Sequence, residues 1–285
     1  MTRQPSVAGF FYEANSEKLK EQLKNCFLDD KGPGSLNIEK RKGAVKAIIA
    51  PHAGYAYSGP CAAWAYKEIG EAEFPDAYII LGTDHGGGGS SIGFDNFETP
   101  LGIVRIDQDL AKLISEKTGL PLDKSAHKGE HSIEVQIPFL QFVSRDFENE
   151  LKIVPILVSH DIELKDAAIG LKEAIMDSGK KVCIIASSDF THYGHNYHYV
   201  PFTSDVPKNL HELDNKAIEF IKKMDSMGFL NYIEETGATI CGVLPITLLM
   251  QAIKASKVSL LQYYTSGDIV GNYKNSVGYA AIAFY

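Results

Sequence analysis

The sequence lacks the features of membrane proteins and of secreted, disulfide-stabilised proteins. No apolar run approaches the about 18 residues that a membrane-spanning helix needs, and the N-terminus becomes charged too early for a signal peptide. The four cysteines, Cys26, Cys61, Cys183 and Cys241, lie far apart and form no CxxC pair. This spacing favours reduced thiols over a disulfide framework. We therefore expect a cytoplasmic protein with no membrane span.

Basic charge and nucleotide-binding motifs are also scarce. The 285 residues include 28 Lys and Arg against 36 Asp and Glu, which gives a formal net charge of −8. This balance argues against a nucleic-acid partner. The glycine run 86–89 fits neither GxxxxGK[ST] nor GxGxxG, so we expect no nucleotide cofactor. The sequence also lacks HExxH and zinc-finger spacings, which leaves a zinc protease or a structural zinc without support.

The sequence does contain a regular alternation of apolar and amphipathic segments. Buried strands are predicted over 44–50, 77–82, 152–159, 181–188, 258–265 and 277–285. Helices are predicted over 16–28, 60–69, 107–119, 162–178, 208–223, 226–235 and 242–254. The segment 131–142 fits both periods and contains Pro138, and we favour a helix there.

This alternation predicts an α/β fold. We expect a single domain over residues 1–285, with a mixed, mostly parallel sheet flanked by helices on both faces. The polar segment 29–43 is the best candidate for a linker, but it is too short to separate two domains.

Polar side chains follow three of the predicted strands. His52 follows the first, Asp84 and His85 follow the second, and Asp189 and His192 follow another. Because ligands of α/β sheets bind outside the carboxyl ends of the strands, these residues predict a shared site. The alternative is that each histidine is a hydrogen-bonded loop residue and that Asp189 caps a helix or turn. Two histidines with an anionic group are also typical of the facial triad of non-haem iron enzymes.

The other histidines receive smaller roles. His131 is a candidate either to hydrogen-bond to a ligand or a carboxylate of the site, or to cap its helix. Asp84, beside His85, is a further candidate supporting residue. We expect the remaining histidines at the surface or in loops: His127, His160, His195, His198 and His211.

Seven stretches of the chain resemble the Memo family, whose fold is similar to that of the class III extradiol ring-cleaving dioxygenases. They are PSVAGFFY, IIAPHAGYAYSGPCAAWAYK, LGTDH, EHSIEVQIPFL, SSDFTHYG, TICGVLPI and VGYAAIAFY. They follow one another over nearly the whole chain, and APHAGY, SSDFTHYG and TICG are together specific.

The resemblance implies a metal pocket that corresponds to the dioxygenase active site, with iron or copper as the metal. His52 and His85 match the two histidine ligands, and Cys241 falls where the dioxygenases have a glutamate ligand. His192 matches the position near the catalytic histidine, and Asp189 lies beside it as an orienting group or a further ligand. A thiolate in place of a carboxylate makes the site softer and disfavours ordinary Fe(II) ring cleavage.

Three functions are consistent with these residues. The first is a metal-dependent redox enzyme in which His192 is the acid–base group. The second is a binding module whose vestigial pocket recognises a peptide or protein, with pocket-lining aromatics at Tyr55, Tyr57, Phe190 and Tyr193. The third is an extradiol dioxygenase. The resemblance further implies a radical-SAM protein and an AMMECR-type protein as microbial partners, and the sequence does not define an oligomeric state.

Overall fold

The centre of the fold is a parallel sheet built from the apolar segments. The computed structural model describes residues 1–285, except for the side chain of Lys40. The central strands lie in the order β6 (Gly102–Ile106), β7 (Lys152–Val158), β3 (Ala77–Thr83), β8 (Val182–Ser187) and β2 (Ala47–Ala50). All four neighbouring pairs are parallel. Strands β2, β3, β7 and β8 are almost entirely buried, which explains why their sequences are continuously apolar.

Further strands extend the sheet on both sides. On one side, β11 (Asn275–Phe284) pairs antiparallel with β2, and β10 (Val258–Thr265) pairs antiparallel with β11. On the other side, β5 (Asn96–Thr99) runs antiparallel to β6, and β1 (Thr2–Arg3) runs parallel to β5. The short strands β4 (Ser91–Ile92) and β9 (His192–Gly194) pair with β7 and β11. The predicted α/β class with a mixed sheet is confirmed.

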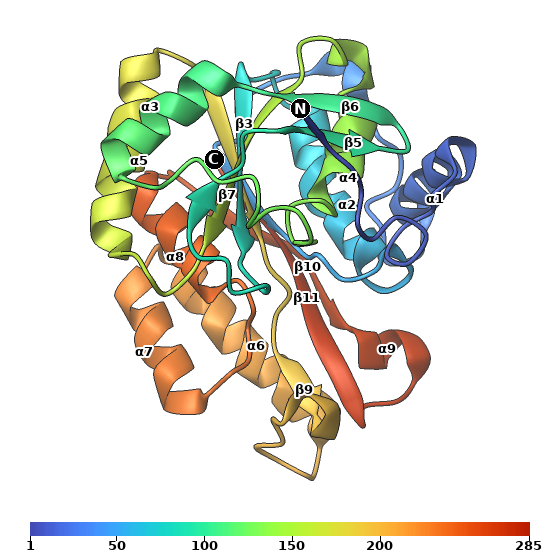
Figure 1. Cartoon of the computed structure of the whole chain (residues 1–285). Coiled ribbons are helices and arrows are strands. Elements are labelled where there is room, and N and C mark those ends of the chain that lie inside the picture. The colour runs from blue at the N-terminus through green and yellow to red at the C-terminus, as the bar shows by residue number, and fades with distance from the viewer.

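Helices cover both faces of this sheet (Figure 1). One layer contains α1 (Ser16–Leu28), α2 (Tyr55–Glu71) and α4 (Gln136–Val143). The other contains α3 (Gln108–Thr118), α5 (Leu164–Ser178), α8 (Val243–Ala252), α7 (Ser226–Thr236) and α6 (Val206–Lys222). The short α9 (Ser266–Val270) joins β10 to β11. Among the described residues, no helix combines the length and apolar character needed to cross a membrane.

Local chemistry explains where these helices begin and end. Asp107 caps α3 by accepting the N–H of Leu110 at 3.1 Å, and Gly119 ends it with a φ of 74°. In the ambiguous segment 131–142, the helix prediction holds from Gln136, and residues 132–135 form turns. Pro138 lies in the first turn of α4, where an N–H has no partner within the helix, so that proline is tolerated.

The strand order brings three polar segments to one edge of the sheet. Strands β3, β8 and β2 are neighbours, and their carboxyl ends meet there. His85, Asp189 and His52 each lie two residues beyond the last residue of one of these strands. The shared edge predicted from the strand ends is therefore present.

Candidate metal centre

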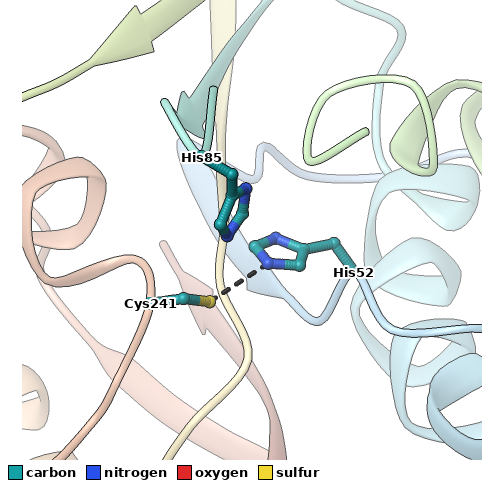
Figure 2. Close-up of side chains that lie close together, drawn as sticks. All are labelled: His52, His85 and Cys241. Carbon is teal, nitrogen blue, oxygen red and sulfur yellow. Dashed lines mark hydrogen bonds between the residues drawn. The ribbon is translucent and has the colours of Figure 1, made fainter. Parts of the chain in front are cut away.

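Three side chains converge at this edge of the sheet. A ring nitrogen of His52, a ring nitrogen of His85 and the sulfur of Cys241 all lie within 4.8 Å of one another. Figure 2 shows the three side chains pointing toward a common centre, with Cys241 Sγ 3.1 Å from His52 Nε2. We call these three residues the metal cluster. The structure thus brings together the residues that the family resemblance assigns as ligands.

Cys241 reaches the metal cluster from the turn that precedes α8. Its carbonyl accepts a hydrogen bond from Thr83 Oγ1 at 2.9 Å, which ties it to the end of β3. The N–H of Gly242 donates to Ser188 Oγ at 3.0 Å. A Cβ on Gly242 would lie 2.3 Å from Ser188 Cβ, so only glycine permits this approach. The N–H of Asp189 then points at Cys241 Sγ, 3.2 Å away.

The hydrogen bonds around His52 define its tautomer. Ser187 Oγ donates to the carbonyl of Ser132 at 2.6 Å and accepts from Gln136 Nε2 at 2.8 Å. A hydroxyl has one hydrogen, so its contact with His52 Nδ1 at 2.8 Å must be accepted from an Nδ1–H. In a neutral ring, the lone pair is then on Nε2, which faces Cys241. The fold therefore aims the lone pair of His52 Nε2 at the Cys241 sulfur.

The buried carboxylate of Glu130 defines which nitrogen of His85 carries a hydrogen. Glu130 Oε1 lies 3.0 Å from His85 Nδ1, and Glu130 Oε2 accepts the backbone N–H of His85 at 2.7 Å. An ionised carboxylate only accepts, so Nδ1 carries a hydrogen, and in the neutral ring the lone pair is on the other nitrogen. Burial opposes protonation of His85, but the hydrogen bond and the charge of Glu130 outweigh it and raise the pKa of His85, so a metal at this nitrogen competes with a second proton. Burial opposes ionisation of Glu130, but the His85 ring and nearby N–H groups outweigh it and lower the pKa of Glu130.

Burial controls the protonation of the other two members of the metal cluster. It lowers the pKa of His52 to about 4, so this ring is neutral at pH 7. Burial, followed by the negative charge of Asp189, raises the pKa of the Cys241 thiol. The hydrogen between Cys241 Sγ and His52 Nε2 is therefore on the sulfur, which donates it to the nitrogen at 3.1 Å. Metal binding here requires that Cys241 lose its proton.

A second group of potential ligands overlaps with the metal cluster. His85, Glu130 and His131 also place ligand atoms within 4.8 Å of one another. The His131 ring stacks on the His85 ring with centroids 4.6 Å apart, and its Nδ1 lies 3.4 Å from Glu130 Oε1. Since Glu130 already binds His85 Nδ1, a metal on that nitrogen would have to displace this hydrogen bond.

The metal cluster adjoins an open pocket of about 540 Å³. His52, His85, His131, Asp189 and His192 lie in its wall. Much of the remaining lining is aromatic or apolar, and includes Phe11, Tyr57, Tyr197, Val270, Val277 and Tyr279. The pocket is wide enough for a small molecule or for one side chain of a peptide.

Asp189 and His192 form a pair in the wall of this pocket. Asp189 Oδ1 accepts the N–H of His52 at 2.8 Å and that of Ala53 at 3.2 Å. Its Oδ2 lies 3.9 Å from His192 Nε2. Burial opposes ionisation of Asp189, but His52 and His192 outweigh it and lower the pKa of Asp189. The carboxylate thus fixes the loop that carries His52 and lies within ion-pair distance of the His192 imidazole beside the pocket.

Three of the predicted pocket aromatics are placed differently. Tyr55 is buried in the core, where its hydroxyl donates to the carbonyl of Val135 at 2.6 Å. Phe190 is fully buried, and the Tyr193 ring stacks on Phe202. These three residues therefore do not line the pocket, and the prediction is corrected. Tyr57 does line it and is 45% exposed. Two residues along a helix is a turn of about 200°, which places Tyr55 and Tyr57 on opposite sides of α2.

Asp84 and His127 also differ from their expected roles. The Asp84 carboxylate accepts the N–H groups of Gly88 and Gly89 at 3.0 and 2.7 Å, so it shapes the glycine-rich loop and makes no hydrogen bond to a member of the metal cluster. His127 is 3% exposed, which corrects its assignment to the surface. By contrast, His160, His195 and His198 are exposed as predicted.

The residues that support the ligands were not identified from the sequence. Glu130 and Ser187 both lie inside the stretches that carry the resemblance, EHSIEVQIPFL and SSDFTHYG, but their partners depend on the tertiary structure. Phe11 and Tyr279 belong to the outermost stretches, PSVAGFFY and VGYAAIAFY. Their positions in the pocket explain why segments near both termini belong to the same pattern.

The donor set of the metal cluster fits a transition metal. In the neutral rings, two imidazole lone pairs and one sulfur face a common point, and each ring donates its other N–H to an acceptor. Such support is what metal-ligating histidines generally have. The mixed nitrogen and sulfur set suits iron, copper or zinc better than magnesium or calcium, which prefer oxygen.

Comparison with known proteins agrees with the sequence motifs. The family of Memo-like proteins matches residues 3–283. The chain belongs to the Memo family. It is 39% identical to a MEMO1 family protein of Methanopyrus kandleri, covering 100% of this chain and 99% of that protein. It is 37% identical to one of Methanothermobacter thermautotrophicus, covering 99% and 100%.

One solved structure supports the fold of this Memo-family chain. An uncharacterized protein from Escherichia coli K12 superposes with a TM-score of 0.52 over 85% of this chain and 100% of that chain. The two sequences are 13% identical, so the likeness concerns the fold alone.

Proposed function

We propose that this Memo-family protein is a metal-dependent redox protein that holds iron or copper between His52, His85 and Cys241. The observation that carries this proposal is the convergence of two oriented imidazole nitrogens and one sulfur within 4.8 Å, beside an open pocket. A bound iron or copper ion would supply one-electron chemistry and a coordination position open to a substrate.

The protein's own residues would bind and orient the substrate and move protons. The rings of Phe11, Tyr57 and Tyr197 offer an apolar wall on which a flat or apolar group can pack. His192 Nε2, paired with Asp189, is placed to accept or return a proton at the pocket surface. Metal binding and proton transfer would thus use different residues of the same pocket.

Metal analysis of the anaerobically purified protein tests the proposal. The wild type should contain near-stoichiometric iron or copper, whereas His52→Ala and Cys241→Ala should lose it. His160→Ala is a suitable control, because His160 is exposed. Full metal content in both ligand variants would overturn the proposed ligand set.

A peptide-binding role is the second candidate, and the exposed tyrosines in the pocket lining favour it. Tyr57 and Tyr197 are 45% and 41% exposed at the mouth of the pocket. If this role is correct, removal of the metal leaves partner binding unchanged, and Tyr57→Ala weakens it. Extradiol ring cleavage is less well supported, because Cys241 gives the donor set a soft sulfur in place of a carboxylate.

A further inference from the structure

Glu130 holds one metal-cluster residue by two separate groups. Its Oε2 accepts the backbone N–H of His85 at 2.7 Å, and its Oε1 faces the ring Nδ1 of the same residue at 3.0 Å. The first contact fixes where the His85 backbone leaves β3, and the second fixes the rotation of its ring. A single contact would fix only one of these.

The carboxylate is itself held by other elements of the fold. Glu130 Oε1 also accepts the N–H of Ser132 at 2.8 Å, and the carbonyl of Glu130 accepts from Arg3 Nη2 at 2.7 Å. The Glu130 side chain is only 2% exposed. With these donors already bound to it, the carboxylate is a poor candidate for a metal ligand.

The two overlapping groups of potential ligands use different nitrogens of His85. Binding at the metal cluster needs the nitrogen that faces His52 and Cys241. Binding between His85, Glu130 and His131 needs the nitrogen that faces Glu130, which carries the hydrogen. The tautomer of one ring therefore determines which of the two sites can bind a metal.

We infer that Glu130 is a positioning residue that sets the tautomer and direction of the His85 ring, and thereby directs the metal to His52, His85 and Cys241. This inference rests on the proposed metal-binding function. Loss of such a partner of a ligating histidine typically weakens metal affinity by about 10–100-fold. His131, at 3.4 Å from the same oxygen, is the weaker partner of this carboxylate.

Anaerobic titration of the full chain with Co(II) tests the inference through affinity and through the absorption bands of the complex. Wild type should show a thiolate-to-Co(II) band that Cys241→Ser abolishes. Glu130→Gln keeps the size of the side chain but replaces one acceptor oxygen with a donor, and should weaken Co(II) binding by about 10–100-fold. The ligand-field bands of the Co(II) complex of Glu130→Gln should change, because the His85 ring is no longer held in one orientation. Glu130→Asp retains the charge, and its Co(II) affinity should lie between those of the wild type and Glu130→Gln.

Tyr12→Phe is the matched control. It removes a 2.8 Å hydrogen bond from Glu134, a buried carboxylate on the same segment, and leaves Glu130 unchanged. It should bind Co(II) like the wild type, and circular dichroism should show all variants folded. If folded Glu130→Gln and Glu130→Asp bind within twofold of the wild type with unchanged bands, the inference is overturned. If the wild type itself gives no thiolate band, the proposed function fails, and the inference fails with it.

Discussion

Two polar clusters each use a glutamate of the segment 127–134, and they are built in different ways: Glu134 belongs to the N-terminal cluster, and Glu130 supports the metal cluster. The N-terminal cluster consists of Arg3, Ser6, Tyr12 and Glu134. Its carboxylate accepts from the Arg3 guanidinium at 2.7 Å, from Ser6 Oγ at 2.7 Å and from Tyr12 at 2.8 Å. The N–H groups of Ser6 and Val7 complete the set. Both oxygens of the Glu134 carboxylate therefore meet donors from the protein itself.

The metal cluster has fewer protein donors: the Asp189 N–H points at Cys241 Sγ, and the thiol hydrogen is shared with His52 Nε2. Ser187 and Glu130 accept the outer N–H groups of His52 and His85, and the inner nitrogens face one another and the Cys241 sulfur. The His85 side chain is 34% exposed, and its inner nitrogen makes no hydrogen bond among the described residues. The first cluster is thus closed by donors of the protein, whereas the second leaves potential ligand atoms facing one another.

Breaking the N-terminal cluster should have the largest effect on stability. Glu134→Ala leaves the Arg3 guanidinium buried without its partner, which typically costs about 3–5 kcal/mol. Urea unfolding of the metal-free protein, followed by circular dichroism, measures this loss. A change below about 1 kcal/mol would show that the cluster does not hold the N-terminal segment.

The pH dependence of stability tests a neighbour of the N-terminal cluster. Burial lowers the pKa of His127 to about 4, from about 6.5 in the unfolded chain. The unfolded state therefore binds the proton more readily between these values, so this contribution is full above pH 6.5 and is lost as the pH falls to 4. It amounts to about 3 kcal/mol. His127→Asn should flatten the stability curve in this window relative to the wild type. Parallel curves for the two proteins would contradict the assignment.

Removing the sulfur should affect metal binding and not folding. Cys241→Ser replaces a soft ligand with a hydroxyl and should weaken Co(II) affinity by about 100-fold, or about 2.8 kcal/mol. The metal-free protein should unfold within about 1 kcal/mol of the wild type, because the serine can still meet His52 and the Asp189 N–H. A strongly destabilised metal-free variant would mean that Cys241 is structural, like the residues of the N-terminal cluster.

Removal of the hydrogen bond between His52 and Ser187 should have the smallest effect on metal affinity. Ser187→Ala removes the acceptor of the His52 Nδ1–H and should weaken Co(II) binding by about tenfold, or about 1.4 kcal/mol. Ser178→Ala is a suitable control, because Ser178 makes its hydrogen bond to the carbonyl of Ile175 at the end of α5. Equal affinities of the Ser187 and Ser178 variants would show that the tautomer of His52 needs no serine.

The strands and helices of the core were predictable because each carries a local signal. Helix α1 was predicted over 16–28 and observed at Ser16–Leu28, and strand β10 was predicted over 258–265 and observed at Val258–Thr265. The short strands β1, β4, β5, β6 and β9 were not predicted, although β6 belongs to the central sheet. They have between two and five residues each, which is too few for a clear period to emerge.

The site was predictable in part, for two separate reasons. The positions of the strand ends predict that His52, His85 and Asp189 lie together, because each follows a strand of a mostly parallel sheet and the carboxyl ends of such strands meet at one edge. Cys241 was assigned by resemblance alone, since a lone cysteine at the start of an apolar helix is ordinarily a small core residue. Tyr55 and His127 were misassigned because burial depends on which neighbours pack against a residue, and these come from distant segments.

The sequence by itself determined the family, the α/β class and the edge of the sheet at which polar residues gather, since motifs, periodicity and strand ends are local properties. Only the tertiary structure decided which nitrogen of each histidine is free. That choice depends on Ser187 facing His52 and Glu130 facing His85, residues that are separated by 135 and 45 positions. A hydrogen bond needs its two atoms within about 3 Å, and sequence spacing does not encode such a distance.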